Sequence, residues 1–229
     1  QNVAIGNGAL YSNTTGIYNS AVGGSVALGN NTTGNYNTAN GSGALRNNTS
    51  ANNNTGIGYQ AIYANQTGSN NSAVGYSALY SNTTGNYNTA IGLKSLFYNN
   101  GSSNTGIGSG TLITNTTGSN NTALGSGADV GANNLTNATA IGNNAIVSAS
   151  NSIQLGNSNV TLVETSGVVF ATGANISGTV TATKFSGDGS GLTGISGPTY
   201  RSSMVLQSSS SAATDSQIDL PGLSFRWKK

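Results

Sequence analysis

The sequence predicts an all-β fold, a parallel β-solenoid or β-roll with coils of about 17 residues each. Three observations predict it: a short phrase that recurs at nearly constant spacing, a small and a branched apolar residue in each copy, and turn-forming residues at a fixed distance from it. Helices tolerate this density of glycine, asparagine and threonine poorly, and a helical hairpin repeat needs more than about thirty residues. Short strands joined by tight turns fit a unit of this length.

The repeated phrase has the form Asn-Thr-Ala-Ile-Gly. Its final glycines follow one another at intervals of 17, 18, 17, 17, 17, 16, 17 and 17, and a variant phrase ends after a further interval of 14. These glycines are Gly6, Gly23, Gly41, Gly58, Gly75, Gly92, Gly108, Gly125 and Gly142, followed by Gly156 in the variant. Because the compositional bias is periodic, we expect an ordered repeat array rather than low-complexity disorder.

The first strand of each coil is predicted at the phrase itself. The residue before the glycine is branched and apolar, as in Ile5 and Val74, except at Asn40, and the residue before that is always Ala or Gly. Neighbouring residues of a strand face opposite sides. We therefore expect the branched residue to lie in the core, and the small residue to face outward and permit close approach by another chain.

A second strand is predicted four residues after each glycine. The residues at this position are Leu10, Ala27, Leu45, Ile62, Leu79, Leu96, Leu112, Asp129 and Ile146, of which Asp129 is the exception. A turn phrase, Asn-Thr-Thr-Gly, lies between the strands at residues 13–16, 82–85 and 115–118. Another asparagine precedes the first strand, and stacked in register these amides can form a hydrogen-bonded ladder. They are Asn2, Asn19, Asn37, Asn54, Asn71, Asn88, Asn104 and Asn121.

Each coil has only two or three modest apolar side chains, which bury too little surface to offset a chain entropy of about 1 to 2 kcal/mol per residue. We therefore expect several chains to pack side by side, most simply three around an axis. Nine or ten coils stacked about 4.8 Å apart would form a rod of about 45 to 50 Å.

The repeat array is predicted to occupy residues 1–156. A smaller, β-rich neck region follows at 157–195, with short strands at 160–163, 168–170 and 180–183 and a loop at 187–194. Residues 196–229 are a serine-rich connector and a C-terminal segment, with a strand candidate at 203–207.

The composition excludes several classes of function. With no Cys and no His, the chain cannot form thiolate or imidazole metal sites or a Ser-His-Asp triad, and its five carboxylates form no close pair. The calcium-binding turn Asp is missing from the repeats, and the loop at 187–191 lacks the Lys-Ser/Thr of a phosphate-binding loop. We expect no enzyme activity, no catalytic residue, no metal and no cofactor.

The charge and hydrophobicity of the sequence indicate whether the chain binds nucleic acid or inserts into a membrane. Seven Lys and Arg residues are too sparse for a nucleic-acid interface, and no apolar run approaches the roughly 18 residues of a membrane span. We therefore expect neither nucleic-acid binding nor membrane insertion.

The tyrosines are the candidate binding residues, because aromatic rows on a polar rod can stack on the sugar rings of a glycan. The alternative is that they pack against the adjacent coil or chain. Five tyrosines in two registers are the candidates: Tyr18, Tyr36 and Tyr87 before the asparagine, and Tyr63 and Tyr80 beside the second strand. Tyr11 and Phe97 share the register of the second group.

The phrase at residues 2–6, NVAIG, resembles the head repeats of trimeric autotransporter adhesins. The longer run at 77–92, SALYSNTTGNYNTAIG, is still more similar to the tandem repeats of phage tail-fibre proteins, and GTVTATKFSGDGSGLTGI at 178–195 resembles a segment common in tail fibres. The two matches together cover residues 2–156 and 178–195. The chain lacks the heptads of an adhesin stalk and a charged helical chaperone.

This resemblance implies a left-handed roll in a homotrimer, located in a virion tail fibre and outside the cell. Its partners would be two further copies of the chain, a host cell-surface glycan or protein, and other fibre or baseplate proteins. One alternative is a bacterial cell-surface adhesin, which a downstream stalk and anchor would distinguish. Another is an ice-binding solenoid, although its threonine row is interrupted by Ser20 and Ser72.

Overall fold

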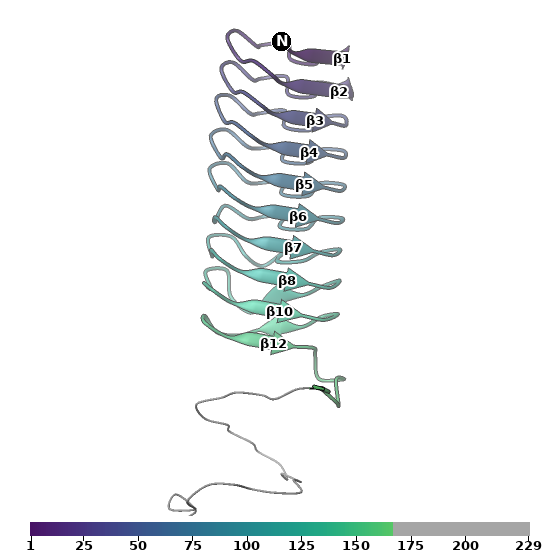
Figure 1. Cartoon of the computed structure of the whole chain (residues 1–229), viewed down its shortest axis with the longest axis vertical. Helices are drawn as coiled ribbons and strands as arrows, with labels where there is room; N and C mark the ends of the chain where they lie inside the picture. The colour runs from purple at the N-terminus through teal and green to yellow at the C-terminus, as the bar shows by residue number, and fades with distance from the viewer. Residues whose placement is uncertain (167–229) are drawn as a thin grey trace, which may run out of the picture. The chain divides into compact units, whose positions relative to one another are not determined.

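The computed structural model describes residues 1–166, which form one compact unit of stacked coils (Figure 1). Each coil contributes one strand to a ten-stranded parallel sheet, in which sequence neighbours lie side by side. Its strands are β1 (Val3–Asn7), β2 (Ser20–Ser25), β3 (Thr38–Asn40), β4 (Thr55–Ile57), β5 (Ser72–Val74), β6 (Thr89–Ile91), β7 (Thr105–Ile107), β8 (Thr122–Leu124), β10 (Thr139–Ile141) and β12 (Ile153–Leu155). The predicted all-β parallel solenoid is confirmed, with a coil length equal to the spacing of the repeated phrase.

The pairing register follows the sequence period directly. Thr55 pairs with Ser72, Gly56 with Ala73 and Ile57 with Val74, so equivalent residues of successive coils lie above one another. The same correspondence holds across the one-residue insertion between β2 and β3, where Ala21 pairs with Ala39. The turns therefore absorb the differences in coil length.

The faces of the first strand are the reverse of the prediction. The small residue is buried and the branched residue is exposed, as the pattern exposed, buried, exposed of β5 shows. The reason is the narrow interior: a Cβ added to Gly56 would lie 3.3 Å from Leu45 Cγ and 3.1 Å from the Ala61 carbonyl oxygen. Leucines of the opposite wall fill the coil, so only Ala or Gly fits inside the strand.

The predicted second strand is absent from the first seven coils. The apolar residue at this place is buried, and in every one of these coils but the second its backbone is left-handed, with φ of 51° at Leu45 and 53° at Leu79. Consecutive residues such as Ala44 and Leu45 are both buried, which an alternating strand does not allow. The segment is a turn that directs two neighbouring side chains inward.

Only the last coils have strands on this wall, β9 (Asp129–Val130) and β11 (Ile146–Val147), which pair in parallel. The predicted core position is off by one residue here, because Val130 and Val147 are fully buried whereas Ile146 is exposed. Extended backbone replaces the left-handed turn and shifts the inward side chain.

The predicted asparagine ladder is confirmed. The Asn71 backbone nitrogen donates to Asn54 Oδ1 at 2.9 Å, and Asn54 Nδ2 donates to the Gly68 carbonyl oxygen at 2.8 Å. Each ladder side chain therefore joins the next coil and the turn of its own coil. Both polar ends of the buried side chain are satisfied, which offsets the cost of burying an amide.

A second buried ladder runs through the turn phrase, where the sequence predicted only turn residues. Asn48 Nδ2 donates to Asn31 Oδ1 at 2.8 Å, and Asn65 Nδ2 donates to Asn48 Oδ1 at 2.9 Å. The ladder breaks after Asn82, whose buried Oδ1 has no partner. The next coil is shorter than its neighbours, and its Asn99 Nδ2 turns to the Gly101 carbonyl oxygen instead.

The short coil has one residue fewer than its neighbours, and an asparagine side chain accepts the hydrogen bonds that a backbone carbonyl accepts in the longer coils. In longer coils a backbone carbonyl closes the turn, as where Thr14 and Thr15 donate from their backbone nitrogens to the Thr32 oxygen. In the short coil Asn100 Oδ1 accepts from the backbone nitrogens of Thr83 and Thr84 at 2.9 and 3.1 Å.

The phrase glycine is required by two constraints. Gly75 has φ of +139°, and a Cβ there would lie 2.4 Å from the Gly92 carbonyl oxygen in the next coil. Any side chain would force the coils apart, which explains why this glycine recurs in each regular coil.

After β12 the chain leaves the coil stack. Residues 157–166 contain no strand, and Val160, Leu162 and Val163 are exposed, so the predicted strand at 160–163 is wrong. The other predicted elements of the neck and C-terminal regions, at 168–170, 180–183, 187–194 and 203–207, lie outside the described residues.

Candidate functional site

The tyrosines form axial rows because the register places equivalent residues of successive coils above one another. Tyr63, Tyr80 and Phe97 make a continuous row, which we call the aromatic stack. The ring centroids of Tyr63 and Tyr80 are 5.1 Å apart and those of Tyr80 and Phe97 are 5.0 Å apart, with nearly parallel planes. The packing of these rings against adjacent coils, expected as the alternative to glycan stacking, is therefore present.

A basic side chain caps each end of the aromatic stack. The Arg46 guanidinium lies 5.7 Å from the centre of the Tyr63 ring, and its Nη1 donates to Tyr63 Oη at 3.0 Å. At the other end Lys94 Nζ lies 5.6 Å from the Phe97 ring centre. Arg46 and Tyr80 cover the two faces of Tyr63, and Tyr63 and Phe97 cover those of Tyr80. Tyr98 makes a further, edge-on contact with Phe97.

The other candidate register is only partly occupied by aromatic residues. Tyr18 and Tyr36 stack with centroids 5.2 Å apart, whereas Tyr87 lies alone between Asn70 and Ser103 and is 66% exposed. All three tyrosines have positive φ, from 56° to 59°. Tyr11, one coil above Gly29, is 85% exposed and has no aromatic neighbour. The five candidate tyrosines therefore do not form a single site.

Sequence reasoning missed a third row, Tyr59 and Tyr76. Their rings stack with centroids 5.2 Å apart and lie one residue after the phrase glycine. The sequence does contain a signal for this row, because both tyrosines follow a phrase glycine directly and are separated by one repeat of the phrase. Both are about half exposed.

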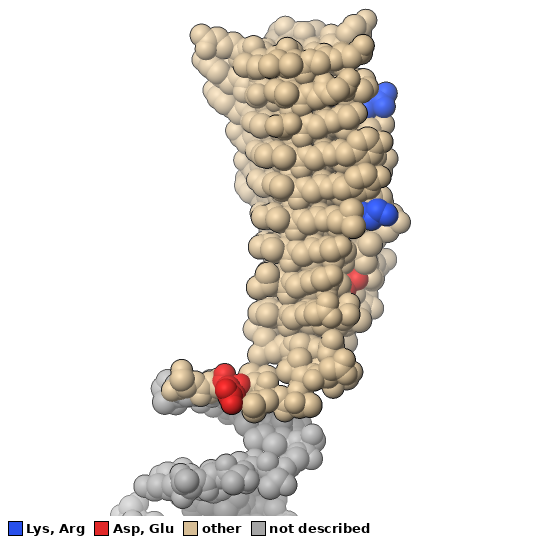
Figure 2. Space-filling model, turned by 90° about the vertical axis from the view of Figure 1, so that its right-hand side faces the viewer, with Lys and Arg blue, Asp and Glu red and all other residues tan. Residues whose placement is uncertain are grey.

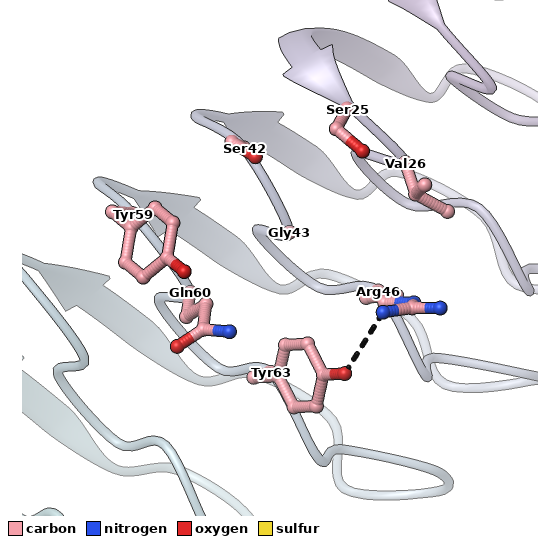
Figure 3. Close-up of a pocket in the computed structure, with 8 residues that line it drawn as sticks. All are labelled: Ser25, Val26, Ser42, Gly43, Arg46, Tyr59, Gln60 and Tyr63. Atoms are coloured by element: carbon pink, nitrogen blue, oxygen red, sulfur yellow. Dashed lines mark hydrogen bonds between the residues drawn. The ribbon is translucent and has the colours of Figure 1, made fainter.

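The aromatic stack and the row of Tyr59 and Tyr76 border a shallow cleft of about 170 Å³ on the side of the coil stack (Figure 3). Arg46, Tyr59, Gln60 and Tyr63 form one part of it, and small residues of the two preceding coils form the rest. Those small residues are Ser25, Val26, Ser42 and Gly43. The cleft therefore combines a cation, an aromatic ring, an amide and hydroxyl groups.

Charge is scarce on the described surface, as Figure 2 shows. Among residues 1–166 the cations are Arg46 and Lys94, which lie on the same side of the stack, and the acids are Asp129 and Glu164. Burial raises the pKa of Asp129 above its ordinary 3.8, although hydrogen bonds from Thr114 and Val130 oppose the shift.

No group of three or more His, Cys, Asp or Glu side chains placed to hold a metal occurs within residues 1–166. No helix in the same residues has the length and hydrophobicity to cross a membrane.

The outward face of the ten-stranded sheet is a second candidate surface. Two parallel rows lie on it, because the first and third residues of each three-residue strand both point outward. One row is threonine and serine from β2 to β10, with Val3 and Ile153 at its ends. The other, which we call the outer apolar row, is 38% exposed at Ile107 and 60% at Ile5. The outer apolar row comprises Ile5, Val22, Ile57, Val74, Ile91, Ile107, Leu124, Ile141 and Leu155, with Asn40 in β3 as its polar member.

Comparison of the chain with protein-family models, with curated proteins and with solved structures finds no match.

Proposed function

We propose that this chain is a non-enzymatic structural and adhesive fibre protein, the rod of a phage tail fibre that attaches the virion to its bacterial host. The observation that carries the proposal is the outer apolar row, which follows a stiff column of coils and has no cover within the described residues. A continuous apolar stripe on a soluble rod is typical of an interface.

Two further copies of the chain are the proposed cover of the outer apolar row. The small residues that suggested side-by-side packing lie inside the coil, so the branched residues take over that role. The resemblance to tail fibres and adhesin heads favours three chains in a left-handed roll. Three chains would also present every binding surface three times, and avidity would then strengthen weak contacts.

The resistance of such a rod to bending would come from its backbone and its two asparagine ladders. Strand pairing joins each coil to the next, and the buried amides of the two ladders add links as far as Asn121, with a break in the second ladder at Asn82. A rod that transmits load and presents a repetitive surface needs no catalytic group. The outward tyrosines are then the proposed contacts with a host glycan or protein.

Immunogold electron microscopy of native particles, with an antibody against residues 1–156, tests the location. Gold on the tail of a virion supports the proposal, and gold on a bacterial envelope supports the cell-surface adhesin instead. Labelled full-length chain should also adsorb to bacterial cells. Failure to adsorb to any strain from the source environment would contradict the adhesive role.

The threonine row favours one other function. Thr89, Thr105 and Thr122 lie outward in consecutive strands of a regular sheet, as an ice-binding surface requires, although Ser72 interrupts the row on one side. A thermal hysteresis assay separates the two functions, because an ice-binding protein depresses freezing without lowering the melting point. The absence of thermal hysteresis at millimolar protein concentration would exclude the ice-binding function.

A further inference from the structure

We infer that the cleft beside Arg46 binds a saccharide that carries a carboxylate, so that the adhesive surface recognises an acidic glycan. This inference rests on the proposed adhesive function and names its ligand class. The cleft brings together a cation, an open aromatic ring face and neutral polar groups.

The cleft lies where the large side chains Tyr59 and Gln60 give way to small residues in the preceding coil. One coil before Tyr59 the equivalent residue is Ser42, and one coil before Gln60 it is Gly43. One coil before Arg46 it is Gly29. The space above Tyr59 and Gln60 is therefore left open by small residues, as Figure 3 shows for Ser42 and Gly43.

Tyr59 offers the cleft a free ring face. Tyr76 covers the other face, with an interplanar angle of 19°. Because the coil on the open side carries only Ser42 at this register, that face is available to the C–H groups of a sugar ring. Tyr63 has no such face, since Arg46 and Tyr80 cover both sides of its ring.

Arg46 supplies the charge that selects the ligand. Its Nη1 is held by Tyr63 Oη, and its guanidinium rests on the Tyr63 ring, so the side chain is oriented before any ligand arrives. The acids of the described residues, Asp129 and Glu164, lie in or beyond the eighth coil, and no ion pair forms within residues 1–166. The remaining guanidinium N–H groups can donate in pairs to a planar carboxylate.

The neutral groups of the cleft match the rest of a sugar. The Gln60 amide and the hydroxyls of Ser25 and Ser42 can donate to and accept from sugar hydroxyls. The cleft is comparable in volume with one pyranose ring, which fits recognition of a single acidic residue within a longer chain. A free phosphate would pair with Arg46 but would leave the ring face of Tyr59 unused.

Lys94 provides a matched control. Its Nζ lies 5.6 Å from the Phe97 ring centre, close to the 5.7 Å between Arg46 and the Tyr63 ring, but Lys94 does not line the cleft. General electrostatic attraction would involve both cations equally, whereas the proposed site requires only Arg46.

Calorimetric or NMR titration of the full-length chain tests the site. The probes are trisaccharides that contain glucuronate, galacturonate or N-acetylneuraminate, with maltotriose as the neutral probe and inorganic phosphate as the bare anion. We expect at least one acidic probe to bind at least about tenfold more tightly than maltotriose or phosphate. Arg46→Ala and Tyr59→Ser should each weaken this binding by about tenfold, and Lys94→Ala by less than about twofold.

Circular dichroism and melting curves of each variant show whether it folds, and Arg46→Lys, which keeps the charge but not the planar fork, should bind with intermediate affinity. Binding of no acidic probe, equal losses in Arg46→Ala and Lys94→Ala, or equal affinity for phosphate would each overturn the inference. Adsorption of labelled chain to bacteria is scored separately. Adsorption without saccharide binding refutes only this ligand, and saccharide binding without adsorption refutes only the adhesive function.

Discussion

Gly106 shows how little space the inner wall of the coil leaves at the residue scale. Most coils have Ala at this position, but a Cβ on Gly106 would lie 2.6 Å from Ser95 Oγ and 2.7 Å from Thr111 Oγ1. These two hydroxyls hydrogen-bond each other at 2.7 Å, and Ser95 Oγ donates to the Gly106 carbonyl oxygen at 2.9 Å. The polar pair occupies the volume that two alanine methyl groups leave free in other coils.

Gly106→Ala should therefore lower the free energy of unfolding by about 1 to 3 kcal/mol, because the added methyl group overpacks the polar pair. Urea unfolding measures the change. The triple variant Gly106→Ala, Ser95→Ala, Thr111→Ala recreates the packing of the neighbouring coils and should recover most of the loss. A triple variant no more stable than the single one would contradict this explanation.

The buried carboxyl group of Asp129 should make the stability of the fold depend on pH. Its carboxylate is nearly inaccessible to solvent and accepts hydrogen bonds from Thr114 Oγ1 at 2.7 Å and from the Val130 nitrogen at 2.8 Å. Desolvation by burial nevertheless raises its pKa above 3.8 in the folded chain. The unfolded chain therefore loses this proton at a lower pH than the folded chain does.

The free energy of unfolding should thus fall as pH rises from 3.8, the ordinary pKa of the carboxyl, to the higher folded pKa, and this loss should persist above it. Asp129→Asn removes the titration and keeps the shape. Urea unfolding of both proteins between pH 3 and 7 isolates the residue, because all other carboxylates are shared. Parallel pH profiles in the two proteins would show that the Asp129 pKa is unshifted.

The short coil is the most informative feature at the element scale. Asn100 Oδ1 replaces a peptide oxygen as the acceptor for Thr83 and Thr84, whereas two coils later the backbone oxygen of Asn133 accepts from Thr116 and Thr117. The sequence shows the deletion as a shortened interval between phrase glycines but does not show which atom compensates for it.

Asn100→Ala should cost about 1 kcal/mol, because it leaves two turn N–H groups without their acceptor. Asn133→Ala is the matched control and should cost less than about 0.5 kcal/mol, since its acceptor belongs to the backbone. Thermal or urea unfolding compares the two. Equal losses would mean that the side chain of Asn100 does not close its turn.

The two walls of each coil differ in how far the sequence predicted them. The first strand, its register and the ladder at Asn54 and Asn71 follow from period and residue type, because each depends on nearest coils alone. The structure of the second wall does not follow from the period, because the sequence does not distinguish Leu45, which has a left-handed φ, from a strand residue. The prediction of which strand face points inward was also wrong. Alternation shows that a strand has two faces, but the width of the coil interior decides which of them is buried.

The outer apolar row is the property of the whole molecule that makes the proposed assembly testable. Its side chains point out of the coil, so polar substitutions should leave the coil intact and remove the surface on which other copies pack. Asn40 shows that a polar residue is compatible with the fold at this position.

Val74→Asn, Ile91→Asn and Ile107→Asn together should convert a trimer into monomers at micromolar concentration, with an unchanged far-ultraviolet circular dichroism spectrum. Analytical ultracentrifugation gives the mass. The control pair Leu93→Asn and Tyr87→Asn changes exposed residues outside the outer apolar row and should remain trimeric. A monomeric wild-type chain would refute the proposed assembly outright.

The candidate site was predicted only in part. Tyr63 and Tyr80 were chosen from their shared register, but the role of Arg46 and the row of Tyr59 and Tyr76 became evident only from the stacking of rings and the cleft beside them. Sequence period shows which side chains share a row. It does not show which rows lie side by side around a turn or which ring face stays open.

The sequence by itself determined the coil length, the parallel register and the repeated use of glycine and asparagine, because these are properties of one coil and its nearest neighbours. The tertiary structure decided which strand face is inside, where the turns adopt left-handed backbone, and how Arg46 and Tyr59 meet at one cleft. Those depend on the space enclosed by a closed coil, in which leucine from the opposite wall leaves room only for alanine or glycine and turns the branched side chains outward.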